Sequence, residues 1–211
     1  MSVYRPAALV RIPSTGSTEV EAVGLQELKS WLKVDEADTF DDGVIQSLNT
    51  AARLRVESET RRALILQTFD QVMDEEPCEE ALELDRSPLV SITSVRTFTD
   101  TDLTDTGGTV MASTGYYVDT ANEPGRVVLT QGTAWPTASR RANAMIVRFT
   151  AGYSSGSSGV PEPLKTAVKA LTAYWYERRG DEALDEAALS QRPLPLHVRA
   201  ILEDYQMPEW G

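Results

Sequence analysis

Residues 40–62 read FDDGVIQSLNTAARLRVESETRR, and this stretch is the starting point for interpreting the rest of the chain. Its apolar residues recur every three or four positions, as on one face of a helix: Val44, Ile45, Leu48, Ala51, Ala52 and Val56. Thr39 can cap this helix, and Asp41 and Asp42 suit the positive end of its dipole. We therefore expect an amphipathic helix from Phe40 to about Arg62.

Two further helices are predicted on either side of this one. Leu25, Leu28, Trp31 and Leu32 have helical spacing, which predicts a short helix ending near Val34. Another helix is expected over 163–179, where prolines suit the first turn and one apolar stripe follows: Leu164, Ala167, Val168, Leu171, Tyr174 and Trp175. A Ser/Gly-rich segment, 154–159, reads as a hinge before it. The residues predicted to lie in the structural core are Trp31, Leu48, Leu171 and Trp175.

The middle of the chain, from Ala63 to Tyr153, is rich in strand-forming residues. Alternating or β-branched runs predict strands in these segments: 64–72, 89–98, 116–119, 126–129 and 144–150. Residues 70–85 hold eight acidic side chains and no basic one. Without a histidine or a regular ligand spacing, this acidity favours a solvated turn and strand face over a metal site. The loop 99–108 resembles a calcium loop only vaguely, because it lacks the required glycine and terminal glutamate.

These patterns predict an α+β fold with a mainly helical core, built from the N-terminal helices and helix 163–179, and a β-rich inserted region. The expected segments are an N-terminal arm 1–24, a first helical part 25–62, a β-rich insertion 63–153, a second helical part 160–190 and a C-terminal tail 191–211. The N-terminal arm can be a strand lying over the core or an arm that reaches a neighbouring subunit, and the sequence leaves both open.

The composition restricts the classes of function. The chain has 211 residues, 41% of them hydrophobic and 25% charged, with a formal net charge of −12. Such acidity argues against a nonspecific nucleic-acid grip, although acidic walls can surround DNA without binding it. No apolar run approaches the roughly 18 residues that a membrane span needs. The first residues lack the hydrophobic core of a signal peptide, so synthesis in the cytoplasm is expected.

Residues that carry enzymatic chemistry are sparse. The single cysteine, Cys78, lies among carboxylates that disfavour a thiolate. The single histidine, His197, has no nucleophile in an elbow-like context near it, and no phosphate-binding glycine loop is present. We therefore predict no catalytic residue, no cofactor and no metal site. An enzyme using scattered carboxylates is a remote alternative, and a small-molecule-binding β module is another.

The C-terminal segment combines prolines with apolar residues. Its spacing predicts one or two amphipathic turns after Pro195, carrying Leu194, Val198, Ile201, Leu202 and Tyr205. Trp210 can be an anchor at an interface, where aromatic residues are enriched, or part of a tail folded back on its own domain. Both interpretations stay open at this point.

The order of these segments resembles the head–tail connector (adaptor) proteins of long-tailed phages and phage-like gene transfer agents. The resemblance extends over about residues 25 to 180 and rests on the order and spacing of short motifs. These motifs are LQELKSWLKV (25–34), DDGVIQSL (41–48), AAR (51–53), VE (56–57), TRRAL (60–64), QT (67–68), RSPLVSI (86–92), FTAGY (149–153), VPEPLK (160–165) and WYERR (175–179).

The resemblance implies a structural protein of the virion neck and no catalytic residues. It implies a homo-oligomeric, dodecameric ring below the portal protein, which extends the DNA channel without sequence-specific binding and offers a platform to the stopper or tail-completion protein. A tail-completion or stopper protein of the same neck is the alternative. Because related C-terminal segments reach toward the portal, position alone makes these residues candidates for portal contact: His197, Ile201, Tyr205, Met207 and Trp210.

Overall fold

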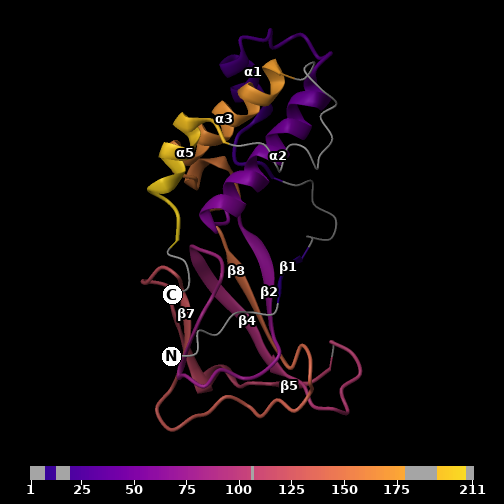
Figure 1. Ribbon diagram of the computed structural model, residues 1–211, viewed down its shortest axis with the longest axis vertical. Coiled ribbons are helices and arrows are strands. Elements are labelled where there is room, and N and C mark those ends of the chain that lie inside the picture. Colours follow the sequence, from indigo (N-terminus) through magenta and orange to yellow (C-terminus); the bar gives the residue numbers. More distant parts are fainter. Residues whose placement is uncertain (1–7, 13–19, 106, 179–193, 208–211) are drawn as a thin grey trace. The chain divides into compact units, whose positions relative to one another are not determined.

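A computed structural model describes residues 8–12, 20–105, 107–178 and 194–207 of the chain. The described residues divide into two compact units (Figure 1). One unit, called the helical unit below, comprises described residues of 18–65 and 153–206. The other, called the β unit, comprises described residues of 1–17, 66–152 and 207–211. The five segments predicted from the sequence remain a prediction.

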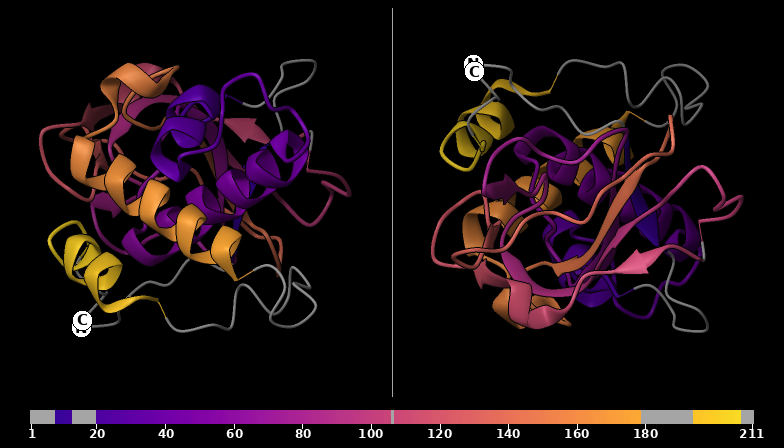
Figure 2. Two further views of the ribbon diagram at one scale, coloured as in Figure 1. Left: turned by 90° about the horizontal axis from the view of Figure 1, so that it is seen from above. Right: turned by 90° about the horizontal axis from the view of Figure 1, so that it is seen from below.

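The helical unit contains four helices among its described residues, namely α1 (Leu25–Leu32), α2 (Asp42–Thr60), α3 (Glu162–Glu177) and α5 (Leu196–Glu203). Helix α3 packs against the other three, and α2 also contacts α1 and α5 (Figures 1 and 2). The unit therefore has one helical core made by segments from both ends of the chain.

Apolar side chains from all four helices fill this core. The buried members include Leu28, Ile45, Leu48, Ala52, Val56, Leu164, Val168, Leu171, Trp175, Val198 and Leu202. Burying a large apolar side chain contributes about 1.5–3 kcal/mol, so this cluster stabilises the helix packing. Three of the four predicted core residues, Leu48, Leu171 and Trp175, lie in it.

The prediction that Trp31 belongs to the core is wrong. Its side chain is 47% exposed, because α1 directs Leu28 into the core and Trp31 lies beside that face. The Nζ atom of Lys169 sits 5.3 Å from the centre of the Trp31 ring, at a distance typical of a cation–π contact. Trp31 thus partners a charged side chain at the surface.

The β unit contains two antiparallel sheets. The first has the order β1-β2-β8-β4-β5, formed by β1 (Ala8–Ile12), β2 (Gln67–Met73), β8 (Met145–Ala151), β4 (Leu89–Thr97) and β5 (Thr109–Val110). The second has the order β3-β7-β6, formed by β3 (Ala81–Glu83), β7 (Arg126–Leu129) and β6 (Tyr116–Asp119). Short 3-10 turns occur at Ser113–Gly115 in this unit and at Ser157–Gly159 in the helical unit.

The predicted mainly helical core with an inserted β region is a wrong description of the fold class. Helices account for 32% of the described residues and strands for 25%, so the protein is a sheet-rich α+β fold. The sheets bury apolar residues of their own, with Phe69, Phe98 and Phe149 all inside. Residues 8–12 also add to the sheet, because β1 pairs with β2 of the same chain from Ala8 opposite Val72 to Ile12 opposite Thr68.

Hydrogen bonds of Asp119 with Asn122 and Arg126 hold the β6–β7 hairpin, and this group of three residues is called the Asp119 clamp below. The Asp119 carboxylate accepts hydrogen bonds from Arg126 Nη2 at 2.6 Å and Asn122 Nδ2 at 2.7 Å. These bonds lower the pKa of Asp119 to about 2 from its ordinary 3.8. Since the folded-state pKa is depressed, the Asp119 clamp stabilises the fold above about pH 4, and this contribution is lost as the pH falls toward about 2.

The Asp119 clamp gives a direct titration test. We expect the side-chain carboxyl carbon of Asp119 to titrate in NMR with a midpoint of about 2. Since Arg126 makes the largest contribution to the shift, Arg126→Ala should move that midpoint up toward 3.8. An unshifted midpoint in the unmodified protein would contradict the hydrogen-bonded geometry.

Candidate interaction site

A buried lysine organises the loop between α1 and α2. The Lys29 side chain is fully buried. Its Nζ atom donates to the carbonyl oxygens of Glu36, at 3.0 Å, and Asp38, at 2.6 Å, and lies 2.8 Å from Oδ1 of Asp42. One cation therefore ties three points of residues 36–42 to α1.

The same loop presents an aromatic side chain to solvent. Asp38 Oδ1 accepts a hydrogen bond from the backbone N–H of Phe40, which helps to fix the approach to α2. The Phe40 side chain is 90% exposed. A large apolar side chain held out on a well-fixed loop is the kind of anchor that interfaces use. Phe40 is accordingly the most prominent candidate contact of the helical unit.

The exposed face of α2 continues from Phe40. Val44 is 42% exposed and Leu54 is 40% exposed. The other exposed residues between them, Gln46 and Ser47, carry no charge. An uncharged strip over three helical turns is unusual in a chain of net charge −12, and depletion of charge is a property of interface centres. We call the strip formed by Phe40, Val44, Ser47 and Leu54 the α2 face.

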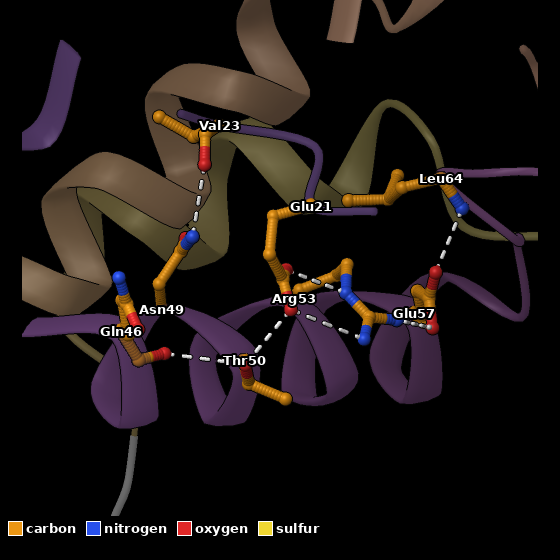
Figure 3. A network of polar contacts seen from close by, with 8 residues as sticks. All are labelled: Glu21, Val23, Gln46, Asn49, Thr50, Arg53, Glu57 and Leu64. Atoms are coloured by element: carbon orange, nitrogen blue, oxygen red, sulfur yellow. Dashed lines mark hydrogen bonds and ion pairs between the residues drawn. The ribbon is translucent and has the colours of Figure 1, made fainter. Parts of the chain in front are cut away.

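A polar network fixes the opposite side of α2 (Figure 3). The fully buried Arg53 places Nε 2.8 Å from Glu21 Oε2 and Nη1 3.2 Å from Glu57 Oε2. Glu57 Oε1 in turn accepts a hydrogen bond from the backbone N–H of Leu64 at 2.9 Å. This arrangement joins the segment before α1 and the segment after α2 to one helix.

Two further bonds extend the network toward the start of α2 (Figure 3). Asn49 Nδ2 donates to the carbonyl oxygen of Val23 at 2.9 Å, and Thr50 Oγ1 donates to Glu21 Oε1 at 2.8 Å. Because leaving a buried polar group without a partner costs free energy, these bonds favour a single position of α2. The α2 face is therefore held on a fixed helix.

The residues predicted to contact the portal differ in how exposed their side chains are. His197 is exposed, Ile201 and Tyr205 are half-buried against the helical core, and Met207 is buried. Trp210 lies outside the described residues. Within the same segment, Val198 and Leu202 are buried in the helical core, so α5 is part of that core.

The described residues contain no candidate metal centre. In residues 8–12, 20–105, 107–178 and 194–207, no group of three or more His, Cys, Asp or Glu side chains could hold a metal ion. Cys78 is exposed. In that same part of the chain, none of the helices has the length and apolar character to cross a membrane.

The sequence interpretation missed both Lys29 and the exposed Phe40. Lys29 lies in a helix where charged residues are ordinarily solvent-facing, so nothing in its spacing signalled burial. Phe40 was placed at the start of a helix without a role. A signal for it existed, since it is the one aromatic residue in the otherwise polar and acidic segment 35–42.

Comparisons with known proteins identify a matching family and solved chains with the same fold. The sequence model of the head completion protein family matches residues 22–208. No curated protein matches the chain in sequence. Three solved chains, each 22% identical in sequence, have the same fold.

These three chains come from gene transfer agent particles. One belongs to the virion of a native particle, with a TM-score of 0.73 and coverage of 95% of this chain and 96% of that chain. Another belongs to the neck of an empty particle computed with C6 symmetry, with a TM-score of 0.74. The third belongs to the neck of a native particle computed with C12 symmetry, with a TM-score of 0.71. In the latter two, 96% of each chain is covered.

Proposed function

Because the chain belongs to the head completion protein family, we propose that it is a structural protein of the virion neck that acts as a head–tail adaptor. In this proposal, copies form a ring below the portal, extend the DNA channel and provide the docking platform for the stopper or tail. The ring has twelve copies, and its role is assembly rather than catalysis.

The observation that carries this proposal is fold likeness over nearly the whole chain. It covers 96% of both this chain and one from a neck structure computed with C12 symmetry. The net charge of −12 supports a channel wall that does not retain DNA, because an acidic surface repels phosphate. The uncharged α2 face supports assembly with other protein surfaces.

The test is to produce particles without this chain. We expect DNA-filled heads that lack tails, seen by electron microscopy, and recovery of tailed particles when the chain is supplied separately. A stopper or tail-completion protein would give a different result, since heads without it would still carry an adaptor ring below the portal. Tailed, functional particles formed without the chain would overturn the proposal.

We propose that α5 contacts the portal through its exposed side. Leu196 is 83% exposed and adjoins the exposed His197, while the half-buried Ile201 and Tyr205 support the helix from below. Met207 is buried, so it would join such a contact only after a rearrangement. Trp210 remains a candidate from its position alone.

Leu196→Glu tests the α5 contact. A charge placed in an apolar contact should weaken capture of the chain by immobilised portal rings by roughly tenfold, which corresponds to about 1.4 kcal/mol. Leu103→Glu is the matched control, because Leu103 is 92% exposed in the β unit. Equal capture of the two variants would count against α5 as the portal-binding element.

A further inference from the structure

The helical unit has a second face of uncharged residues, on α3, and Arg178 borders it with its guanidinium carbon 4.0 Å from the centre of the Tyr174 ring. Thr166, Ala170, Ala173 and Tyr174 recur at helical spacing and are each half-buried. The two lysines of α3, Lys165 and Lys169, are buried and directed elsewhere. Lys165 Nζ pairs with Glu162 Oε1 at 2.8 Å, and Lys169 Nζ pairs with Glu27 Oε1 at 2.8 Å. We call the strip formed by Thr166, Ala170, Ala173 and Tyr174 the α3 face.

We propose that the α2 face of one copy packs against the α3 face of the next copy around the ring. This inference rests on the proposed function, because it requires the ring. The two faces are complementary in size, since Phe40, Val44 and Leu54 are large and Ala170 and Ala173 are small. Small residues on one helix let a facing helix approach closely and accept its larger side chains.

Ring closure requires two different faces. A contact of the α2 face with itself would be two-fold symmetric, and such a contact ends at a dimer. A contact between two different surfaces of the same chain passes from copy to copy and closes into a ring when the rotation allows it. The α2 and α3 faces provide such a pair within one unit.

Charge also favours this pairing. Within one copy, the Tyr176 hydroxyl donates to Asp41 Oδ2, so the last turn of α3 lies at the same end of the unit as the start of α2. The start of α2 follows the acidic residues Asp35, Glu36 and Asp38, whereas the end of α3 carries the exposed cation Arg178 beside the exposed Glu177. In a ring, each residue lies at the same position along the ring axis in every copy, because the copies are related by rotation about that axis. The acidic end of one copy therefore lies level with Arg178 of its neighbour.

Cross-linking tests the pairing in the full-length protein. Ser47 is six residues after Asp41 and Ala170 is six residues before Tyr176, so both lie about 9 Å along their helices from the Asp41–Tyr176 contact. Ser47→Cys and Ala170→Cys are introduced into separate chains that also carry Cys78→Ser, which removes the exposed native thiol. The two chains are mixed, assembled on portal rings and oxidised.

We expect a disulfide-linked dimer in the mixed sample and none when either variant is assembled alone. Rings seen by electron microscopy without that cross-link, or with cross-links in the single-variant samples, would overturn the pairing and leave the proposed function standing. Absence of any ring would contradict the proposed function, and the pairing with it.

Charge exchange provides a second test that does not depend on disulfide geometry. Glu36→Arg and Arg178→Glu should each reduce ring occupancy on the portal severalfold, because each places like charges opposite one another. Combining both changes in one chain should restore occupancy, since the attraction is re-formed with opposite sign. Additive losses in the double variant would contradict the pairing.

Discussion

Replacing Arg53 by alanine is expected to lower the free energy of unfolding of the helical unit by about 3–5 kcal/mol. Arg53 is fully buried and neutralises Glu57, which is itself buried and bonded to the backbone of Leu64. Without the guanidinium, the Glu57 carboxylate stays in the interior and loses this ion pair. The second partner, Glu21, is partly exposed and can be solvated, so the Glu57 side accounts for most of the loss.

The experiment is chemical denaturation of both proteins, followed by circular dichroism at a helix-sensitive wavelength. Arg55→Ala is the matched control on the same helix. The Arg55 Nη2 atom lies 2.7 Å from Glu59 Oε1, but both side chains are partly exposed, so this pair contributes only about 0.3–0.5 kcal/mol. If the two variants lose similar amounts of unfolding free energy, the burial of the Arg53 ion pairs does not add to stability, and the expectation is wrong.

The helices were predicted well because their apolar residues repeat with the helical period. Helix α2 spans Asp42–Thr60, within the expected 40–62, and α3 spans Glu162–Glu177, close to the expected 163–179. Periodicity reports which face of a helix is apolar, but it does not resolve the edge of that face. Trp31 lies at such an edge, which explains why it reads as core and is half exposed.

The sequence pattern did not predict how much of the fold is formed by sheets relative to helices. Strand β2 pairs with β8, and the ion pair between Asp70 and Arg148 joins residues 78 positions apart. The alternation of apolar and polar residues within one strand does not specify which other strand it pairs with. The sequence pattern therefore predicted separate strands but not the two sheets or the strand order in each. Residues 8–12 illustrate the same point, since the sequence left a strand and an arm both open, and only the pairing with β2 makes them an edge strand.

The candidate site was even less accessible from sequence. The α2 face is visible only once the opposite face is known to be buried, because Val44 looks like an ordinary member of the apolar stripe. Lys29 escapes prediction for a different reason. Two of its three partners are main-chain carbonyl oxygens, and main-chain groups leave no residue-type signal.

Lys29→Met is the second substitution with a large expected effect. Methionine keeps an unbranched apolar stem of similar length but removes the ammonium group, leaving two carbonyl oxygens and Asp42 without their donor. Each unsatisfied buried group costs about 1–3 kcal/mol, and opening of the loop to water relieves part of this. We expect a loss of about 2–3 kcal/mol in the free energy of unfolding, measured by denaturation.

Hydrogen exchange distinguishes loosening of this loop from a general loss of stability. If Lys29 holds residues 36–42, the amide of Phe40 should exchange faster in Lys29→Met by a larger factor than amides in the middle of α2, because local opening exposes only the loop. Lys33→Met is the control, since Lys33 is exposed at the end of the same helix and should change neither rate. Equal acceleration throughout α2 would contradict a local role. Loss of ring occupancy in Lys29→Met together with selective exchange at Phe40 would link the buried ammonium to assembly, because the proposed pairing requires the fixed loop to present Phe40 to the neighbouring copy.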